Sequence, residues 1–565
     1  MQEWMSPARG LRRPAALLRV LVVAGAVAAA VTAGPVVAVA SADEPAGTTV
    51  VGRLVQAVPE TEHHDHHGHG HDADPLTWVE TAQGAVPVQS ADVEDLPVGS
   101  TVTLDVDGEV TGEEDGEPLP VLSTGAVVPP APAAVLPGPV TNEVTVVLVA
   151  PAGTAPDAGA TAGQVAALVS GPVAEFWSSQ TGGAVRVGVG PTHEWITTTT
   201  GCADARALWN EVAAEVGFQP GPGKHLLLRL SSQTRNQPGC YYALAEVGSG
   251  PGSGGLLYVR DQLTSVIAHE LGHNFGLNHS SALQCDGALE TGTCRTAGYR
   301  DYYDVMGASW KHLGSLSAPQ AALLGALPAS GTRHLGVHDA PESLLLAPLA
   351  TGSGTRAIRL TDAEGTDYWL EYRSATRQDS WLGSPAENRY GLDSGVLLRR
   401  SATFPDTAVL LDGTPAAAAG WDADLQTALP AGEPIVLSGG DFTVTVRSLA
   451  DGASIDVVPT AAGQAVVPAA PRDNGAGQLQ AGTARSGQGA GTSPSPATGP
   501  AVAEVDPLTV PWFPTEDRSA VLASPMLEPT SGTASLGGLA VALAGAGLAG
   551  TTLLVVRRAR RLRLR

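Results

Sequence analysis

One short stretch of the sequence, residues 269–279, carries side chains whose types and spacing suit a metal ion. It reads HELGHNFGLNH and places histidines at positions 269, 273 and 279. On a helix, His269 and His273 lie one turn apart on the same face, where two neutral imidazoles can bind one zinc ion. Glu270 lies beside them and can reach a water molecule on the metal. The stretch therefore predicts a metal centre with a carboxylate base next to it.

A helix over residues 261–275 must position the first two histidines. Its apolar positions recur along one face, and Asp261 is the expected N-cap. Gly276 ends the helix because glycine adopts positive φ without a side-chain clash, and His279 then returns as the third ligand. Three protein ligands leave a fourth position for water, as in catalytic zinc sites. The prediction is one catalytic zinc ion (Zn2+); Ca2+ is compatible with the chain, but no motif indicates it.

The alternative for these histidines is an ordinary helix with surface histidines, which the complete H-E-x-x-H-x-x-G-x-x-H pattern disfavours. A methionine downstream strengthens the catalytic interpretation. Met306, in the segment YDVMG at 303–307, is the only methionine between Met5 and Met526. Its alternative is a methionine that merely fills the core.

The motif and this methionine turn together resemble the metzincin zinc peptidases. Within that group, residues 142–325 resemble the gametolysin-like peptidases. The resemblance implies hydrolysis of peptide bonds, with Glu270 accepting a proton from zinc-activated water and passing it to the leaving amine. No tyrosine follows Met306 in the turn, so an extra tyrosine ligand is not expected.

The chain ahead of the motif alternates between strand and helix patterns. Strands are predicted at 142–150, 184–189, 225–230 and 256–259, and helices at 161–178 and 202–216. This alternation predicts an α/β (α+β) fold with a mixed, mainly parallel sheet for a metzincin-like domain over residues 141–330. Strand patterns separated by Gly, Asp and Pro turns predict an all-β, sandwich-like domain over 331–459.

Residues 43–140 form an acidic, cysteine-free region ahead of the metzincin-like domain. Alternating stretches such as 101–106 predict strands, so the region is either a propeptide that keeps an exported protease inactive or a small β-region of another role. Its densest motif is the His-rich tract at 63–72, HHDHHGHGHD, a composition that can bind metal. Three roles remain open for the tract: metal capture, a latch on the active-site zinc, or a solvated polar loop. A cysteine latch is excluded because no cysteine precedes Cys202.

Four cysteines, an even number in a chain with an export signal, predict two disulfides. Of the three pairings, we favour Cys202–Cys240 and Cys285–Cys294, because each closes a local loop. The alternative, a metal site with cysteine ligands, lacks any C-x-x-C pair.

Both ends of the chain have the pattern of membrane signals. Residues 1–42 combine arginines, an Ala/Val/Leu run and small residues at a cleavage position, which predicts a signal peptide; an uncleaved anchor helix is the alternative. Residues 460–535 are rich in Ala, Gly, Pro, Ser and Thr and predict a disordered stalk. The uncharged run 536–556 and the basic tail 557–565 predict a single-pass anchor with the body outside the cell. Cell-wall sorting is the alternative to this membrane anchor, but no Leu-Pro-x-Thr-Gly pattern precedes the run.

The charge of the chain limits its partners. A formal net charge of −24 disfavours nucleic acid, which needs basic patches, and suits a protein outside the cell. The expected partner is a protein or peptide substrate. Two functions remain: a surface-anchored zinc endopeptidase, or a catalytically weak surface binding protein that uses its β-domain.

Overall fold

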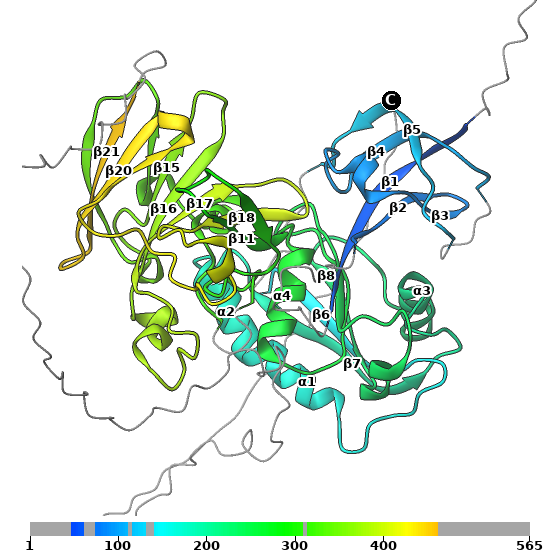
Figure 1. Ribbon diagram of the computed structural model, residues 1–565. Helices are drawn as coiled ribbons and strands as arrows, with labels where there is room; N and C mark the ends of the chain where they lie inside the picture. The colour runs from blue at the N-terminus through cyan, green and yellow to red at the C-terminus, as the bar shows by residue number, and fades with distance from the viewer. Residues whose placement is uncertain (1–46, 62–73, 111–115, 132–139, 309–312, 461–565) are drawn as a thin grey trace, which may run out of the picture. The chain divides into compact units, whose positions relative to one another are not determined.

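The computed structural model describes residues 47–61, 74–110, 116–131, 140–308 and 313–460 (Figure 1). These residues form a mixed α/β fold with further β-sheets, as the sequence predicts. The predicted signal peptide, His-rich tract, membrane segment and basic tail lie outside the described residues, as does the stalk from residue 461 onward. Among the helices that the structure describes, none is long and apolar enough to cross a bilayer.

The largest sheet has the strand order β3-β2-β1-β9-β10-β8-β6-β7, and β4 and β5 join it through β1. Strands β6, β7, β8 and β10 are parallel, whereas β9 is antiparallel to both of its neighbours, β1 and β10. Short Val- and Leu-rich runs form β6, β8 and β10 because both faces of the sheet are covered there, whereas the edge strand β7 is more polar and partly exposed. The bounds are β6 Asn142–Ala150, β7 Val187–Thr197, β8 Lys224–Leu230, β9 Ala243–Glu246 and β10 Gly255–Val259.

Alternate residues of β6 face the two sides of this sheet, as the pleat requires. Val146 and Leu148 belong to the core that includes helices α1, α2 and α4, which carries the metal motif. Val147 and Val149 belong to the core on the other side, which includes α3. The helix bounds are α1 Ala162–Leu168, α2 Ala174–Gln180, α3 Ala205–Val216, α4 Thr264–Asn274 and α5 Ala318–Leu323.

The helix predicted over 161–178 is interrupted in the structure. Thr161 caps α1 through a capping box with Gln164, as a threonine at this position favours. Residues 169–173 then form a π-helical turn with Pro172 inside it and non-helical backbone angles at Gly171. Proline lacks an N–H and its ring clashes with the preceding turn, which explains the break before α2.

Strand β1 connects two parts of the large sheet. Its first half, Thr48–Arg53, pairs with β4, and its last residues, Ala57–Glu60, pair with β9. In Figure 1, β1 is the dark blue strand that leaves the β2–β5 group and runs toward the strands beside α4. The bounds are β1 Thr48–Glu60, β2 Leu76–Thr81, β3 Gly84–Pro87, β4 Thr101–Val106 and β5 Val121–Val128.

The region after residue 331 consists mainly of strands, as predicted, in two sheets that share one apolar core. The seven-stranded sheet, β12-β11-β18-β17-β16-β15-β13, includes the strand that begins at His279. This sheet therefore crosses the predicted domain boundary at 330/331. The bounds are β11 His279–Cys285, β12 Cys294–Ala297, β13 Thr332–Gly336, β14 Glu342–Leu346, β15 Ala357–Thr361, β16 Asp367–Arg373, β17 Gly395–Ser401, β18 Asp406–Leu411, β19 Pro434–Leu437, β20 Phe442–Ser448 and β21 Ala453–Pro459.

Candidate metal centre

Helix α4 presents the first two histidines of the motif. The prediction that Asp261 caps this helix is wrong: the helix begins at Thr264, and Leu263 occupies the N-cap position without a side-chain hydrogen bond. The packing of apolar residues in the core, not a polar cap, decides where this helix begins. At the other end, Gly276 has φ 90°, and a Cβ there would lie 3.0 Å from the carbonyl oxygen of Gly248. A glycine is therefore required where the chain turns from α4 toward β11.

The structure brings the three motif histidines together. His269 and His273 are fully buried, and His279 is 6% exposed. Nδ1 of His269 lies 2.7 Å from the carbonyl oxygen of Val305, and Nδ1 of His273 lies 2.8 Å from that of Leu277. A carbonyl oxygen only accepts, so both Nδ1 atoms carry a proton, and in a neutral ring Nε2 is then the nitrogen that can bind a metal. Burial is the main cause that lowers the pKa of His273 to about 3, which keeps its ring neutral.

A fourth group joins this cluster from the N-terminal region. Oε1 of Glu60, the last residue of β1, lies 3.1 Å from Nε2 of His269, 3.1 Å from Nε2 of His279 and 3.6 Å from Nε2 of His273. Its side chain is fully buried, and Oε2 has no hydrogen-bond partner among the described residues. Burial alone raises the pKa of this carboxyl, but the facing imidazoles outweigh it and hold the pKa well below its ordinary value.

Glu60 is a candidate ligand that the sequence does not predict. It ends an apolar run, VVGRLVQAVPE, and lies 209 residues before His269. No spacing rule links it to the motif. The pairing of β1 with β9 brings it to the histidines, and a single sequence offers no signal for that pairing.

The arrangement of these four residues fits a zinc ion. Four atoms about 2.1 Å from one tetrahedral zinc ion lie about 3.4 Å from one another. Here Nε2 of His269 and Nε2 of His273 are 3.1 Å apart, and the distances to Glu60 are similar. When both rings are neutral and carry the proton on Nδ1, their Nε2 lone pairs face each other at this distance, and a shared cation relieves the repulsion. The donor set, three imidazole nitrogens and one carboxylate oxygen, is one that zinc prefers.

Glu270 lies next to the cluster on α4. Its side chain is fully buried, and neither carboxylate oxygen has a hydrogen-bond partner among the described residues. Burial first, and then the negative charge of Glu60, raise the pKa of Glu270 well above its ordinary value. A buried carboxylate without a hydrogen-bond partner lowers the stability of the fold, so its presence indicates a function. A raised pKa suits a group that must take up and release a proton.

Met306 lies directly under the histidine helix. It is fully buried, and a Cβ added to Gly272 of α4 would lie 2.3 Å from its Sδ. Asp304 holds the turn by accepting a hydrogen bond from the Met306 N–H at 2.7 Å, and the Met306 carbonyl accepts one from the Ser280 N–H at 2.9 Å. The methionine turn therefore supports both α4 and the strand that carries the third histidine. Tyr299 packs its ring against His279, with ring centroids 3.8 Å apart.

A buried ionic cluster joins the methionine turn to the β-strands that follow it. Arg399 on β17 pairs with Asp301, and its Nε lies 3.0 Å from Oε1 of Glu371 on β16. The Asp301 carboxylate also accepts a hydrogen bond at 2.6 Å from Ser280, the neighbour of His279. All four residues are fully buried. The second sheet thus helps to hold the strand that positions His279.

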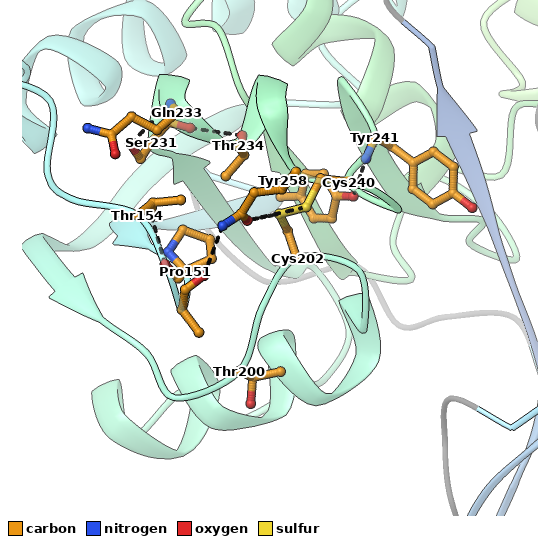
Figure 2. Close-up of a disulfide and its surroundings, with 12 residues drawn as sticks. Pro151, Thr154, Thr200, Cys202, Ser231, Gln233, Thr234, Cys240, Tyr241 and Tyr258 are labelled. Atoms are coloured by element: carbon orange, nitrogen blue, oxygen red, sulfur yellow. Dashed lines mark hydrogen bonds between the residues drawn. A yellow bond between two sulfur atoms is a disulfide. The ribbon is translucent and has the colours of Figure 1, made fainter.

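Both predicted disulfides are present, Cys202–Cys240 and Cys285–Cys294. Figure 2 shows the first of them beside Tyr258 of β10, whose hydroxyl oxygen accepts a hydrogen bond from the Tyr241 N–H at 3.4 Å. Cys240 lies three residues before β9, so this disulfide ties the loop that leads into β9 to the loop before α3.

His225 is a buried histidine outside the cluster. Its Nδ1 lies 2.9 Å from Oδ1 of Asn274, and its Nε2 lies 2.9 Å from Oδ1 of Asn142. Burial lowers its pKa to about 4. These contacts link α4 to β6 and β8, which is a structural role.

Residues 232–305 match the sequence model of a family described as Metallo-peptidase family M12B Reprolysin-like. The match includes the metal motif and ends one residue before Met306. No curated protein matches the chain. The family match and the buried Glu60/His269/His273/His279 cluster together fit a metzincin-type zinc peptidase.

Proposed function

We propose that the protein is a zinc-dependent endopeptidase of the gametolysin-like kind that cleaves extracellular proteins. One observation carries the proposal: the Nε2 atoms of three histidines converge beside Glu270, a buried carboxylate whose oxygens have no hydrogen-bond partner among the described residues. The match of residues 232–305 to reprolysin-like metallopeptidases supports the same activity.

The three histidines and Glu270 have separate roles in the proposed reaction. His269, His273 and His279 would hold the zinc ion, which when bound polarises a peptide carbonyl and lowers the pKa of water. Glu270 accepts a proton from the attacking water and returns it to the leaving amine, and burial and the Glu60 charge raise its pKa, which suits a group that takes up and releases a proton. The hydrogen bonds from Nδ1 to backbone carbonyls orient the ligand rings, as the surrounding groups of metal sites commonly do.

We also propose that the enzyme is exported and held at the cell surface by residues 536–556. Two disulfides are consistent with an oxidising compartment. The charge pattern at the two ends of the sequence gives the remaining support.

The experiment that tests the activity is casein cleavage by the full, zinc-loaded chain. Because Glu60 fills the remaining side of the histidine cluster, the comparison is made in a Glu60→Ala background, with and without Glu270→Gln. Loss of the general base should lower cleavage by about 10²–10⁴-fold while zinc content stays at one per chain. Glu215→Gln, which changes an exposed glutamate on α3, is the matched control and should leave cleavage unchanged. Equal rates with and without Glu270 would refute the proposal.

The second candidate is a catalytically weak surface binding protein. The observation that favours it is the fourth protein group at the cluster, because zinc sites with four protein ligands are usually structural. On this hypothesis Glu60 is a permanent ligand, and removing it releases the metal and produces no peptidase.

A further inference from the structure

In the large sheet, strand β9 pairs antiparallel with β10 on one edge, and β1 pairs with the other edge of β9. Residues Ala57–Glu60 pair with Ala243–Glu246. The Tyr242 N–H donates to the Glu60 carbonyl and the Val247 N–H donates to the Gln56 carbonyl, both at 2.8 Å. An extended peptide that adds to a sheet needs a free edge, and this edge is already paired.

The same strand closes the metal centre. The side chains of Glu60, His269, His273 and Glu270 are fully buried, so a substrate carbonyl has no route to the histidines while β1 is in place. The Glu60 carbonyl accepts a hydrogen bond from the Tyr242 N–H and therefore points away from the histidines. The end of β1 thus directs the Glu60 carboxylate, and not a peptide carbonyl, toward the histidines. The segment therefore fills the site without offering a bond for cleavage.

We propose that β1 is a built-in inhibitor: its last residues occupy the substrate edge of β9, and the Glu60 carboxylate takes the fourth ligand position on the zinc ion. This inference rests on the proposed peptidase function. It gives the N-terminal region the role of a propeptide with a glutamate latch. Activation requires that β1 leave β9, which frees the sheet edge and the metal position together.

An ion-pair chain fastens the inhibitor to the catalytic sheet. Arg206 on α3 pairs with Glu80 on β2, next to β1, and its Nη1 lies 2.9 Å from Oε1 of Glu246 at the end of β9. The Arg206 side chain is only 8% exposed, which limits screening by solvent. Glu80 therefore helps to seat the inhibitor without touching the metal centre, and it offers a second way to loosen β1.

The test uses the full chain with cobalt(II) in place of zinc, because the visible spectrum of cobalt reports its ligands. Azide is the probe for a free ligand position. In the unmutated chain azide should leave the spectrum unchanged, whereas in Glu60→Ala and in the near-isosteric Glu60→Gln it should shift the spectrum. Glu80→Ala should give an intermediate response, and Glu94→Gln, an exposed glutamate in the same region, should behave like the unmutated chain.

Casein cleavage provides the second measurement. Glu60→Ala should raise the rate by about a hundredfold, the lower end of the gain that tethering gives to a binding partner. The inference is overturned if azide shifts the spectrum of the unmutated chain as strongly as that of the variants. It is also overturned if both Glu60 variants lose the metal or stay closed to azide.

The two proposals fail in different ways. If the Glu60 variants open to azide but cleave no casein, Glu60 blocks the metal and the peptidase proposal fails. If the unmutated chain cleaves casein as fast as the variants, the peptidase proposal holds and the inhibitor is refuted.

Discussion

Gly272, the glycine between the motif's Glu270 and His273, faces Met306 so closely that a side chain should not fit. A Cβ at this position would lie 2.3 Å from Met306 Sδ and 3.2 Å from its methyl carbon. Ordinary contacts are about 3.5–4.0 Å, so Gly272→Ala forces the methionine to move by about 1 Å or more in a fully buried site. Such overpacking costs about 1–3 kcal/mol, and the helix propensity of alanine returns about 1 kcal/mol. We expect Gly272→Ala to be destabilised by up to about 2 kcal/mol in total.

Urea unfolding of the full chain in excess zinc, followed by tryptophan fluorescence, measures this change. Met306→Ala removes the two closest atoms and leaves only Trp177 Cζ2, at an ordinary 3.4 Å, so in that background Gly272→Ala should stabilise the chain, as helix propensity predicts. Gly163→Ala on α1 is the control, because its Cβ would meet only one atom, at 3.9 Å. If Gly272→Ala is as stable as Gly163→Ala, Met306 does not restrict the side chain at position 272. The same conclusion follows if Gly272→Ala has an equal effect with Met306 and with Met306→Ala.

Two further perturbations test the surroundings of the site. Arg399→Met leaves Asp301 as a buried charge without its guanidinium partner, whereas Glu371 keeps its pair with Arg373 at 2.8 Å. The free energy of unfolding should therefore fall by about 3–5 kcal/mol, and the bound metal should dissociate faster. Arg400→Met at a partly exposed pair should cost less than about 1 kcal/mol, and equal losses in urea unfolding would contradict this. The pKa of His225 falls from 6.5 to about 4 on folding, so the unfolded chain binds the proton more readily and stability should drop by up to about 3 kcal/mol as pH falls from 6.5 to 4. His225→Gln should flatten this part of the pH profile of unfolding, and an unchanged profile would show that His225 does not titrate on unfolding.

Local patterns carried most of what could be predicted about this protein. The i, i+4 spacing of His269 and His273 places both rings on one face of any helix, whatever surrounds it, and Gly276 permits the turn that follows. The alternation of short apolar runs and helical periods likewise predicted the α/β core. The predictions that were wrong concerned the ends and the continuity of helices. Packing decides where α4 begins, and the ring of Pro172 interrupts the helix predicted over 161–178.

The histidine spacing thus predicted by itself a metal-binding motif with a carboxylate beside it. Only the tertiary structure decided what surrounds that motif. Glu60 reaches it through a strand pairing that closes a loop of about two hundred residues, and His279 begins a strand of a sheet formed largely by residues after 331. The periodicity of a sequence records which residues are neighbours along a helix or strand, whereas contacts between distant strands depend on which edges and cores the folded chain brings together.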